Sequence, residues 1–440
     1  MLNRFFHLDT HHTNVKTEIL AGVTTFLTMA YIIVVNPQVL TNAGMPFSGV
    51  LFATIIVSAA SSIAMGLFAN LPYAVAPGMG INAFFTFGIV LSMKVPWQTA
   101  LGAVFISGIL FVVLSLTGIR TQIVRAIPPP LRYGLAAGIG IFLALIGLSS
   151  VEFVVAAPHT LLGFGGINVT VLLFSFGFVL TAVLVVKGVR GALTIGIVSV
   201  SVSSLIVSHA GMAVGILSTP LVTLPHTLFS LPSFDVVFKL DIIGACSLGM
   251  MAPVFSIFFV DLFDSVGTFV GVAEVSGLVD KEGIPLNLDK ALLVDAGSTI
   301  ISGLCGTSSG NVFVESAAGI REGGRTGLTA ITAGILFIPF MFCSPLLSFI
   351  PAVATAPVLV LVGIFMVQPL MQVRWSDYEE AIPAFLALVL VPLTFSITQG
   401  VIWSFLAYTV MKILSGKARD IHWMLYVIDA FAVVNLVVGE

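Results

Sequence analysis

The chain has 440 residues, of which 58% are hydrophobic and only 8% are charged, and its mean hydropathy is +1.14. Soluble domains usually carry about 25% charged residues, so water is not expected to be the main solvent of this chain. The formal net charge is −3, and the scattered basic residues leave no contiguous basic face for nucleic acid. These figures exclude a soluble domain and a nucleic-acid-binding protein.

The first eighteen residues, MLNRFFHLDTHHTNVKTE, are polar and titratable. They lack the apolar h-region of a secretory signal peptide, so we expect 1–18 to be a cytoplasmic segment that is not cleaved. A helix crosses the hydrocarbon core in about 20 apolar residues, and the apolar runs that follow predict an all-α membrane protein with about fourteen spans. The predicted spans lie near 19–40, 48–69, 73–92, 97–118, 133–151, 169–187, 191–209, 242–275, 291–305, 309–320, 326–345, 353–371, 381–396 and 398–414.

An extra apolar segment at 421–438 contains His422 and Asp429, and it is compatible with either a surface helix or a further span. Cys246, Cys305 and Cys343 lie in apolar stretches without metal-ligand spacing, so we expect them to serve packing.

The distribution of basic residues predicts the orientation. If the N-terminus is cytoplasmic, fifteen of the 17 Lys and Arg residues fall in cytoplasmic segments, and only Lys94 and Lys239 fall outside. This sorting follows the positive-inside rule, so we expect a multi-pass protein of the cell (plasma or inner) membrane.

Two pairs of segments indicate an internal repeat. IPPPLRYGLAAGIGIF at 127–142 resembles IPAVATAPVLVLVGIF at 350–365 with an offset of 223. GINAFF at 80–85 resembles GNVFVE at 310–315 with an offset of 229, which aligns Asn82 with Asn311. The shared order and an odd number of intervening spans favour two seven-span repeats of opposite topology, as in many secondary transporters.

Two spans are too rich in helix-breaking residues to be regular helices. The third, LPYAVAPGMGINAFFTFG at 71–88, contains Pro77, Gly78 and Gly80, and the tenth, GTSSGNVFVESAAGI at 306–320, is short and rich in Gly and Ser. Interrupted segments at corresponding places in two halves point to a binding site near the bilayer midplane. Close packing at a simple kink is the alternative for either segment.

Carboxylates in the predicted spans strengthen this interpretation. Asp261 and Asp264 lie in the middle of the eighth span, three residues apart and therefore on adjacent parts of one helical face, and Glu315 lies in the tenth. A charged side chain at the bilayer centre costs roughly 2.5–3.5 kcal/mol, so such residues usually have a function. Capping of a neighbouring half-helix is the alternative role, most of all for Asp264.

Six motifs resemble those of the azaguanine-type hypoxanthine/adenine/guanine permeases, within the nucleobase–ascorbate transporter superfamily. They are AYIIVVNP (30–37), APGMGINAFFTFG (76–88), VDLFDSVGT (260–268), GTSS (306–309), ESAAGI (315–320) and GGRTGLTA (323–330), and the similarity covers nearly the whole chain.

The resemblance implies two inverted seven-span repeats, proton symport of purine bases and a homodimer. It also implies a core of spans 1–4 and 8–11 (19–118 and 242–345) and a gate of spans 5–7 and 12–14 (133–209 and 353–414). The substrate-contacting positions of the family fall on Asn82, Asp261 and Glu315, with Asp264 supporting them and Phe84 near the ligand. This chain has GNVFV at 310–314, where the family carries hydroxyl residues, so the resemblance does not specify the preferred base.

A purine presents ring N–H donors, ring-nitrogen acceptors and a flat apolar face. The predicted site offers the carboxylates of Asp261 and Glu315 as acceptors, and the ring of Phe84 as a wall. Backbone N–H groups at the half-helix ends, from Thr307 through Ser308 to Ser309 or around Ala83 and Phe84, are the expected donors. No cofactor or metal is expected.

Each of Asp261, Asp264 and Glu315 is a candidate proton carrier, because a neutral acid costs less to move through the membrane than a charged one. A transporter of another nucleobase or small solute is the nearest alternative. An intramembrane enzyme that binds a magnesium diphosphate is disfavoured, because the single Asp-x-x-Asp has no Lys or Arg beside it in the span.

Overall fold

A computed structural model describes residues 2–117, 127–157, 161–213, 222, 227–276 and 286–438, and it shows an all-α architecture. Within those ranges, seven helical segments are long and apolar enough to cross a membrane, and shorter apolar helices lie between them. Gly118, the last residue of the fourth predicted span, lies outside the described residues.

The described part of the first half contains helices, three short strands (one at the third span and two that form a hairpin) and two π-helical stretches. Its elements are α1 (Leu2–Phe5), α2 (Val15–Met29), α3 (Ile32–Thr41), α4 (Phe47–Ala64) with a π-helical turn at Met65–Ala69, β1 (Val75–Pro77), α5 (Met79–Ala83) with a π-helical continuation at Phe84–Ser92, α6 (Trp97–Leu116), α8 (Pro129–Ser150), β2 (Val154–Ala157), β3 (Leu161–Phe164), α9 (Val169–Val186) and α10 (Ala192–Ala213).

The second half repeats this plan, with a short strand where the tenth span was predicted. Its elements are α11 (Ile242–Ala245), α12 (Met251–Ser276), α13 (Leu288–Cys305), β4 (Gly310–Val312), α14 (Ser316–Arg321), α15 (Gly327–Phe337), α16 (Ser344–Ser348), α17 (Ala352–Val367), α18 (Tyr378–Thr394), α19 (Ile397–Leu414) and α20 (Trp423–Val438). The predicted eighth span is therefore α11 and α12 with a turn between them, and 421–438 is largely helical.

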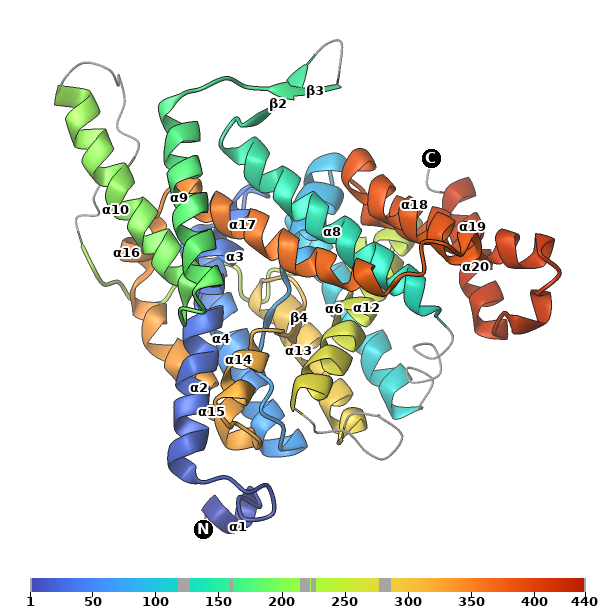
Figure 1. Ribbon diagram of the computed structural model, residues 1–440, viewed down its shortest axis with the longest axis horizontal. Helices are drawn as coiled ribbons and strands as arrows, with labels where there is room; N and C mark the ends of the chain where they lie inside the picture. Colours follow the sequence, from blue (N-terminus) through green and yellow to red (C-terminus); the bar gives the residue numbers. More distant parts are fainter. Residues whose placement is uncertain are drawn as a thin grey trace.

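The helices pack into two groups. One group, which we call the interrupted-span bundle, includes α2, α4 and α15, where α15 packs on the other two, and α6 and α13, which pack on each other. The other, which we call the long-helix bundle, includes α8, α17 and α18, where α8 packs on the other two, and α9 and α10, where α10 packs on α9 and α17. Figure 1 shows α8 and α17 crossing the middle of the molecule side by side, with α2, α14 and α15 below them. Fewer contacts join the two bundles than hold each one together.

Close approach of backbones explains the tight packing of the interrupted-span bundle. A Cβ atom added at Gly66 would lie 2.3 Å from the Gly327 carbonyl oxygen. The buried Glu18 carboxylate of α2 accepts hydrogen bonds from the Arg325 backbone N–H (2.9 Å) and the Thr329 hydroxyl (2.6 Å), so it caps the start of α15. These contacts fix α15 against α2.

The repeat predicted with an offset of 223 corresponds to α8 and α17. Gly140 and Gly363, which are 223 residues apart, meet where these helices cross: a Cβ at Gly363 would lie 2.4 Å from the Gly140 carbonyl oxygen, and one at Gly140 would lie 2.6 Å from that of Gly363. Equivalent positions of the two repeats thus contact each other, as expected at the axis that relates two inverted halves.

The second predicted alignment, with an offset of 229, was wrong in register. Strands β1 and β4 begin at Val75 and Gly310, so the interrupted spans correspond with an offset of 235. Asn82 lies in a half-helix, whereas Asn311 lies in a strand. The shared Asn-x-Phe pattern is too short to specify register in segments so rich in Gly and Phe.

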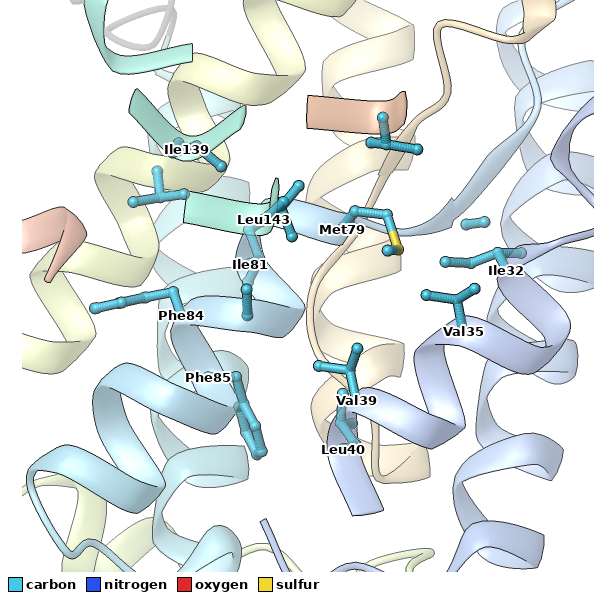
Figure 2. Packing of buried hydrophobic residues seen from close by; sticks show 14 of the residues in the cluster. Ile32, Val35, Val39, Leu40, Met79, Ile81, Phe84, Phe85, Ile139 and Leu143 are labelled. Carbon is cyan, nitrogen blue, oxygen red and sulfur yellow. The ribbon is translucent and has the colours of Figure 1, made fainter. Parts of the chain in front are cut away.

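An apolar wall lies where the two bundles meet. Figure 2 shows Ile139 and Leu143 of α8 near Ile81 and Met79 of the interrupted third span. On the side of the third span opposite α8 lie the α3 residues Ile32, Val35 and Val39. Gly80 allows this contact, because a Cβ there would lie 2.7 Å from the Ile139 side chain.

The packing role predicted for the cysteines holds for Cys305 and Cys343, which are partly buried against the main core. The prediction was wrong for Cys246, which is exposed where the chain turns between α11 and α12.

Candidate substrate-binding site

The two interrupted spans cross in the middle of the interrupted-span bundle. Strands β1 and β4 pair antiparallel, with Ala76 opposite Asn311 and Pro77 opposite Gly310. The Gly78 N–H donates to the Ser309 carbonyl (2.9 Å), and the Phe313 N–H donates to the Ala74 carbonyl (2.9 Å). The breaks in the two spans therefore satisfy each other's backbone groups, as a buried interruption at membrane depth must.

The half-helices α5 and α14 both begin near this crossing, but they differ in the hydrogen bonding of their first backbone N–H groups. Residues Met79, Gly80 and Ile81 form the first turn of α5, whose N–H groups have no partner inside a helix. In α14 the first N–H groups are already bonded, because Ser316 donates to the Phe313 carbonyl and Ala317 to the Val314 carbonyl. The start of α5 is thus the end that can offer backbone donors to a ligand.

This arrangement corrects the predicted donors. The Phe84 N–H bonds to carbonyls of its own helix, at Gly80 and Ile81, and the Thr307 N–H bonds to the Ser302 carbonyl. Ala83 follows Asn82, whose N–H already bonds to Gly78, so it lies inside the helix and not at its end. The sequence located the interrupted segments, but the available donors begin several residues earlier, at Met79.

The loop before β4 forms a fully buried polar layer. The Ser309 hydroxyl donates to Asp261 Oδ2 (2.6 Å), and so does the Thr299 hydroxyl of α13 (2.9 Å). The Ser308 hydroxyl donates to the Asn82 side-chain oxygen, which joins this loop to α5. All five side chains are buried, with at most 1% of their surface exposed.

Thr307 completes the layer on the other side. Asn36 of α3 donates to the Thr307 hydroxyl (2.9 Å) and to the Thr54 hydroxyl of α4 (2.7 Å). Asn82, Asp261, Thr307 and Ser308, predicted from distant segments, are therefore brought into one continuous layer.

A second set of carboxylates lies on the other side of the crossing and is partly exposed. The Asn311 amide donates to Asp264 Oδ2 (2.8 Å), and the Tyr31 hydroxyl donates to Glu315 Oε1 (2.8 Å). Asp264 and Glu315 are both intermediate in exposure, whereas Asp261 is completely buried. Although the two aspartates are only three residues apart, Asp261 lies in the buried polar layer and Asp264 is partly exposed.

Gly78, the residue before α5, lies beside Asn311 and Asp264. A Cβ added there would lie 3.1 Å from the Asn311 side-chain nitrogen and 3.4 Å from Asp264 Oδ2. The start of α5 therefore passes directly beside the Asp264 carboxylate.

The predicted aromatic wall lies elsewhere in this structure. Phe84 is 2% exposed and packs one turn back against Gly88 of its own helix. In Figure 2 its ring points away from Val35 and Val39. Phe313, whose ring centroid is 6.4 Å from that of Tyr31, is the aromatic residue beside Glu315.

Sequence reasoning assigned no site role to four of the residues that hold the site together, although two of them lie in the recognised motif at 30–37; Ser309 was expected as part of the donor stretch and instead donates through its hydroxyl. The four are Tyr31, Asn36, Thr299 and Asn311. Among the described residues, no three His, Cys, Asp or Glu side chains lie together in a way that would hold a metal ion.

An all-helical membrane chain with two interrupted spans crossing at a buried polar site belongs to the class of membrane transporters. A sequence profile of the Permease family (Xan_ur_permease) matches residues 16–402. The chain belongs to this permease family.

Relatives match over almost their full length. A putative permease of Methanocaldococcus jannaschii is 43% identical over 97% of this chain and 96% of its own. The adenine permease AdeP of Escherichia coli is 40% identical over 99% of this chain and 96% of its own. The guanine/hypoxanthine permease PbuO of Bacillus subtilis is 41% identical over 95% of this chain and 96% of its own.

Solved structures show the same fold at low identity. The transmembrane domain of a cyanobacterial bicarbonate transporter, BicA, matches with a TM-score of 0.67 and 17% identity over 90% of this chain and 97% of that domain. The murine anion transporter Slc26a9 in its inward-facing state matches with a TM-score of 0.64 and 10% identity, over 91% of this chain and 68% of that protein.

Proposed function

We propose that this permease imports purine nucleobases (adenine, guanine or hypoxanthine) by proton symport across the cell membrane. Relatives at about 40% identity carry the names of adenine and guanine/hypoxanthine permeases. The relatives that carry these names divide between the two kinds of base, so the preferred base is a matter for experiment.

The observation that carries the proposal is the presence of two partly exposed carboxylates at the crossing of β1 and β4, one of them beside the first turn of α5. Asp264 and Glu315 offer carboxylate oxygens, and the first turn of α5 offers backbone N–H groups beside Asp264. A purine has both N–H donors and ring-nitrogen acceptors on its edges, so it can use both kinds of group at once. Phe313, two residues before Glu315 in sequence, supplies an apolar face.

We assign roles to the predicted site residues from this geometry. Glu315 and Asp264 contact the base, whereas Asp261 holds the loop that carries Ser309 beneath it. Asn82, Thr307 and Ser308 fix that loop against α5 and α3. Ala83 and Phe84 form the apolar packing behind the donors at the start of α5.

We further propose that the interrupted-span bundle is the moving core, and that the long-helix bundle, with α8 and α17 at its centre, is the gate. The two bundles contact each other less extensively than their own helices do, which supports this division because it allows one bundle to move against the other.

Uptake of a proton by Glu315, Asp264 or Asp261 would neutralise one charge and lower the cost of moving the loaded core through the membrane. Alternating access then couples base and proton. The N-terminus lies in the cytoplasm and the protein forms a homodimer in this proposal.

Uptake measurements test the proposal. Cells that lack their own purine permeases and express this chain should take up labelled hypoxanthine, and unlabelled adenine, guanine and hypoxanthine should compete to different degrees, whereas uracil should not. A protonophore should abolish accumulation, and replacing sodium by potassium should leave it unchanged. Strict sodium dependence would rule out proton symport, and competition by uracil alone would rule out a purine substrate.

A further inference from the structure

Tyr31 lies at a turn inside the first span, where one helix gives way to the next. Helix α2 ends at Met29 and α3 begins at Ile32, so Tyr31 occupies the turn between them. Its side chain is only 1% exposed, and its hydroxyl donates to Glu315 Oε1 at 2.8 Å. A phenol is buried here with its hydroxyl directed at the partly exposed acid of the tenth span.

The surroundings hold both groups in place. The Thr28 hydroxyl lies 3.5 Å from the Glu315 carbonyl oxygen, and the rings of Tyr31 and Phe313 pack at 6.4 Å. Gly319, one turn beyond Glu315, allows α14 to lie against α2, because a Cβ there would come within 2.4 Å of the Ala21 carbonyl oxygen. The first span therefore fixes both the backbone and the carboxylate of Glu315.

We propose that Tyr31 determines base specificity by occupying one oxygen of Glu315, so that this carboxylate presents a single acceptor oxygen to the ligand. A carboxylate with both oxygens available binds two adjacent N–H groups side by side, whereas one with a single oxygen available binds one. This inference rests on the proposed purine-binding role of Glu315.

Guanine and hypoxanthine differ in the number of N–H donors that they can offer to Glu315. Guanine carries two adjacent donors on one edge, the ring N1–H and the 2-amino group, whereas hypoxanthine carries the ring N–H alone. With Tyr31 in place, the extra donor of guanine finds no second oxygen on Glu315. The wild-type protein should therefore bind guanine within about twofold of hypoxanthine, and the Tyr31→Phe variant should favour guanine by at least about tenfold, the value of one additional hydrogen bond to a charged group.

The test is equilibrium binding of hypoxanthine and guanine to the purified full-length protein. Four forms are compared: wild type, Tyr31→Phe, Glu315→Gln and the double variant. The matched control is Tyr408→Phe in α19, where the ring lies beside Lys412. The ratio of guanine to hypoxanthine affinity should rise at least about tenfold in Tyr31→Phe, stay unchanged in Tyr408→Phe, and change less than about twofold when Tyr31→Phe is added to Glu315→Gln. A role in folding alone would weaken both bases together and leave the ratio constant.

Two results would overturn the inference and leave the proposed function intact. One is an unchanged ratio in Tyr31→Phe, given that Glu315→Gln weakens both bases. The other, which needs no variant, is a wild-type protein that binds guanine tenfold or more tightly than hypoxanthine. Failure of the proposed function is a different result, in which Glu315→Gln binds both bases as wild type does or the wild type binds neither.

Discussion

Removing the charge of Glu315 is the most direct perturbation of the proposed site. Glu315→Gln keeps the shape of the side chain and one acceptor oxygen, but it removes the negative charge that Tyr31 and the ligand share. A buried hydrogen bond to a charged group contributes about 1.5–3 kcal/mol, compared with about 1 kcal/mol between neutral groups. If the base makes one such bond, its affinity should fall by about threefold to thirtyfold.

The same half-helix supplies a matched control. Glu322 lies at the other end of α14, where it forms an ion pair with Arg190 of the loop between α9 and α10. This pair is exposed to solvent, and exposed pairs contribute about 0–1 kcal/mol. Glu322→Gln therefore changes the charge of α14 by the same amount and should leave binding of the base nearly unchanged.

Binding of labelled hypoxanthine to purified protein in detergent separates these effects from transport rate. Melting temperatures of both variants would show that neither loses the fold. Equal affinities for the two variants, both close to wild type, would refute the assignment of Glu315 as a ligand-contacting acid.

Three further variants test separate parts of the account. Asp261→Asn should retain most of the affinity, because the amide oxygen can still accept from Ser309 and the acid is sealed from the ligand; a loss equal to that of Glu315→Gln would mean that Asp261 contacts the base. Asn82→Ala releases the Ser308 loop and should weaken binding by about fivefold and alter competition between bases; an unchanged competition profile would assign Asn82 to local packing alone. Gly363→Ala places a methyl group 2.4 Å from a carbonyl oxygen and should cost about 1–3 kcal/mol of stability, measured as a lower melting temperature, whereas Gly297→Ala, with nothing within 4 Å, should be neutral or stabilising; equal melting temperatures would refute the contact between α8 and α17.

The sequence predicted the interrupted spans well because their cause is local. Pro77 and Gly78 cannot continue a helix, and the tenth span is too short and too rich in Gly to do so. The structure places a strand followed by a half-helix at both positions. The buried carboxylates were predictable for the same reason, since an acid in an apolar run is visible without knowledge of the fold.

Which aspartate is fully buried and which is partly exposed was not predictable from the sequence, because this depends on packing between distant segments. Asp261 and Asp264 lie on adjacent parts of one helical face, and only the contacts of Thr299, Ser309 and Asn311 place one in the buried polar layer and the other on the partly exposed side. The same limit applies to Tyr31, whose hydrogen bond to Glu315 joins the first span to the tenth and has no sign in the local sequence.

Accumulation of hypoxanthine in liposomes that contain only this protein tests the central claim most directly. With an inwardly directed proton gradient, the wild-type protein should concentrate labelled hypoxanthine above the external level, and collapse of the gradient should release it. The Glu322→Gln protein should do the same, and the Glu315→Gln protein should not. Concentration of hypoxanthine by Glu315→Gln to the wild-type level, or no proton-driven uptake of any purine base by the wild type, would contradict the account.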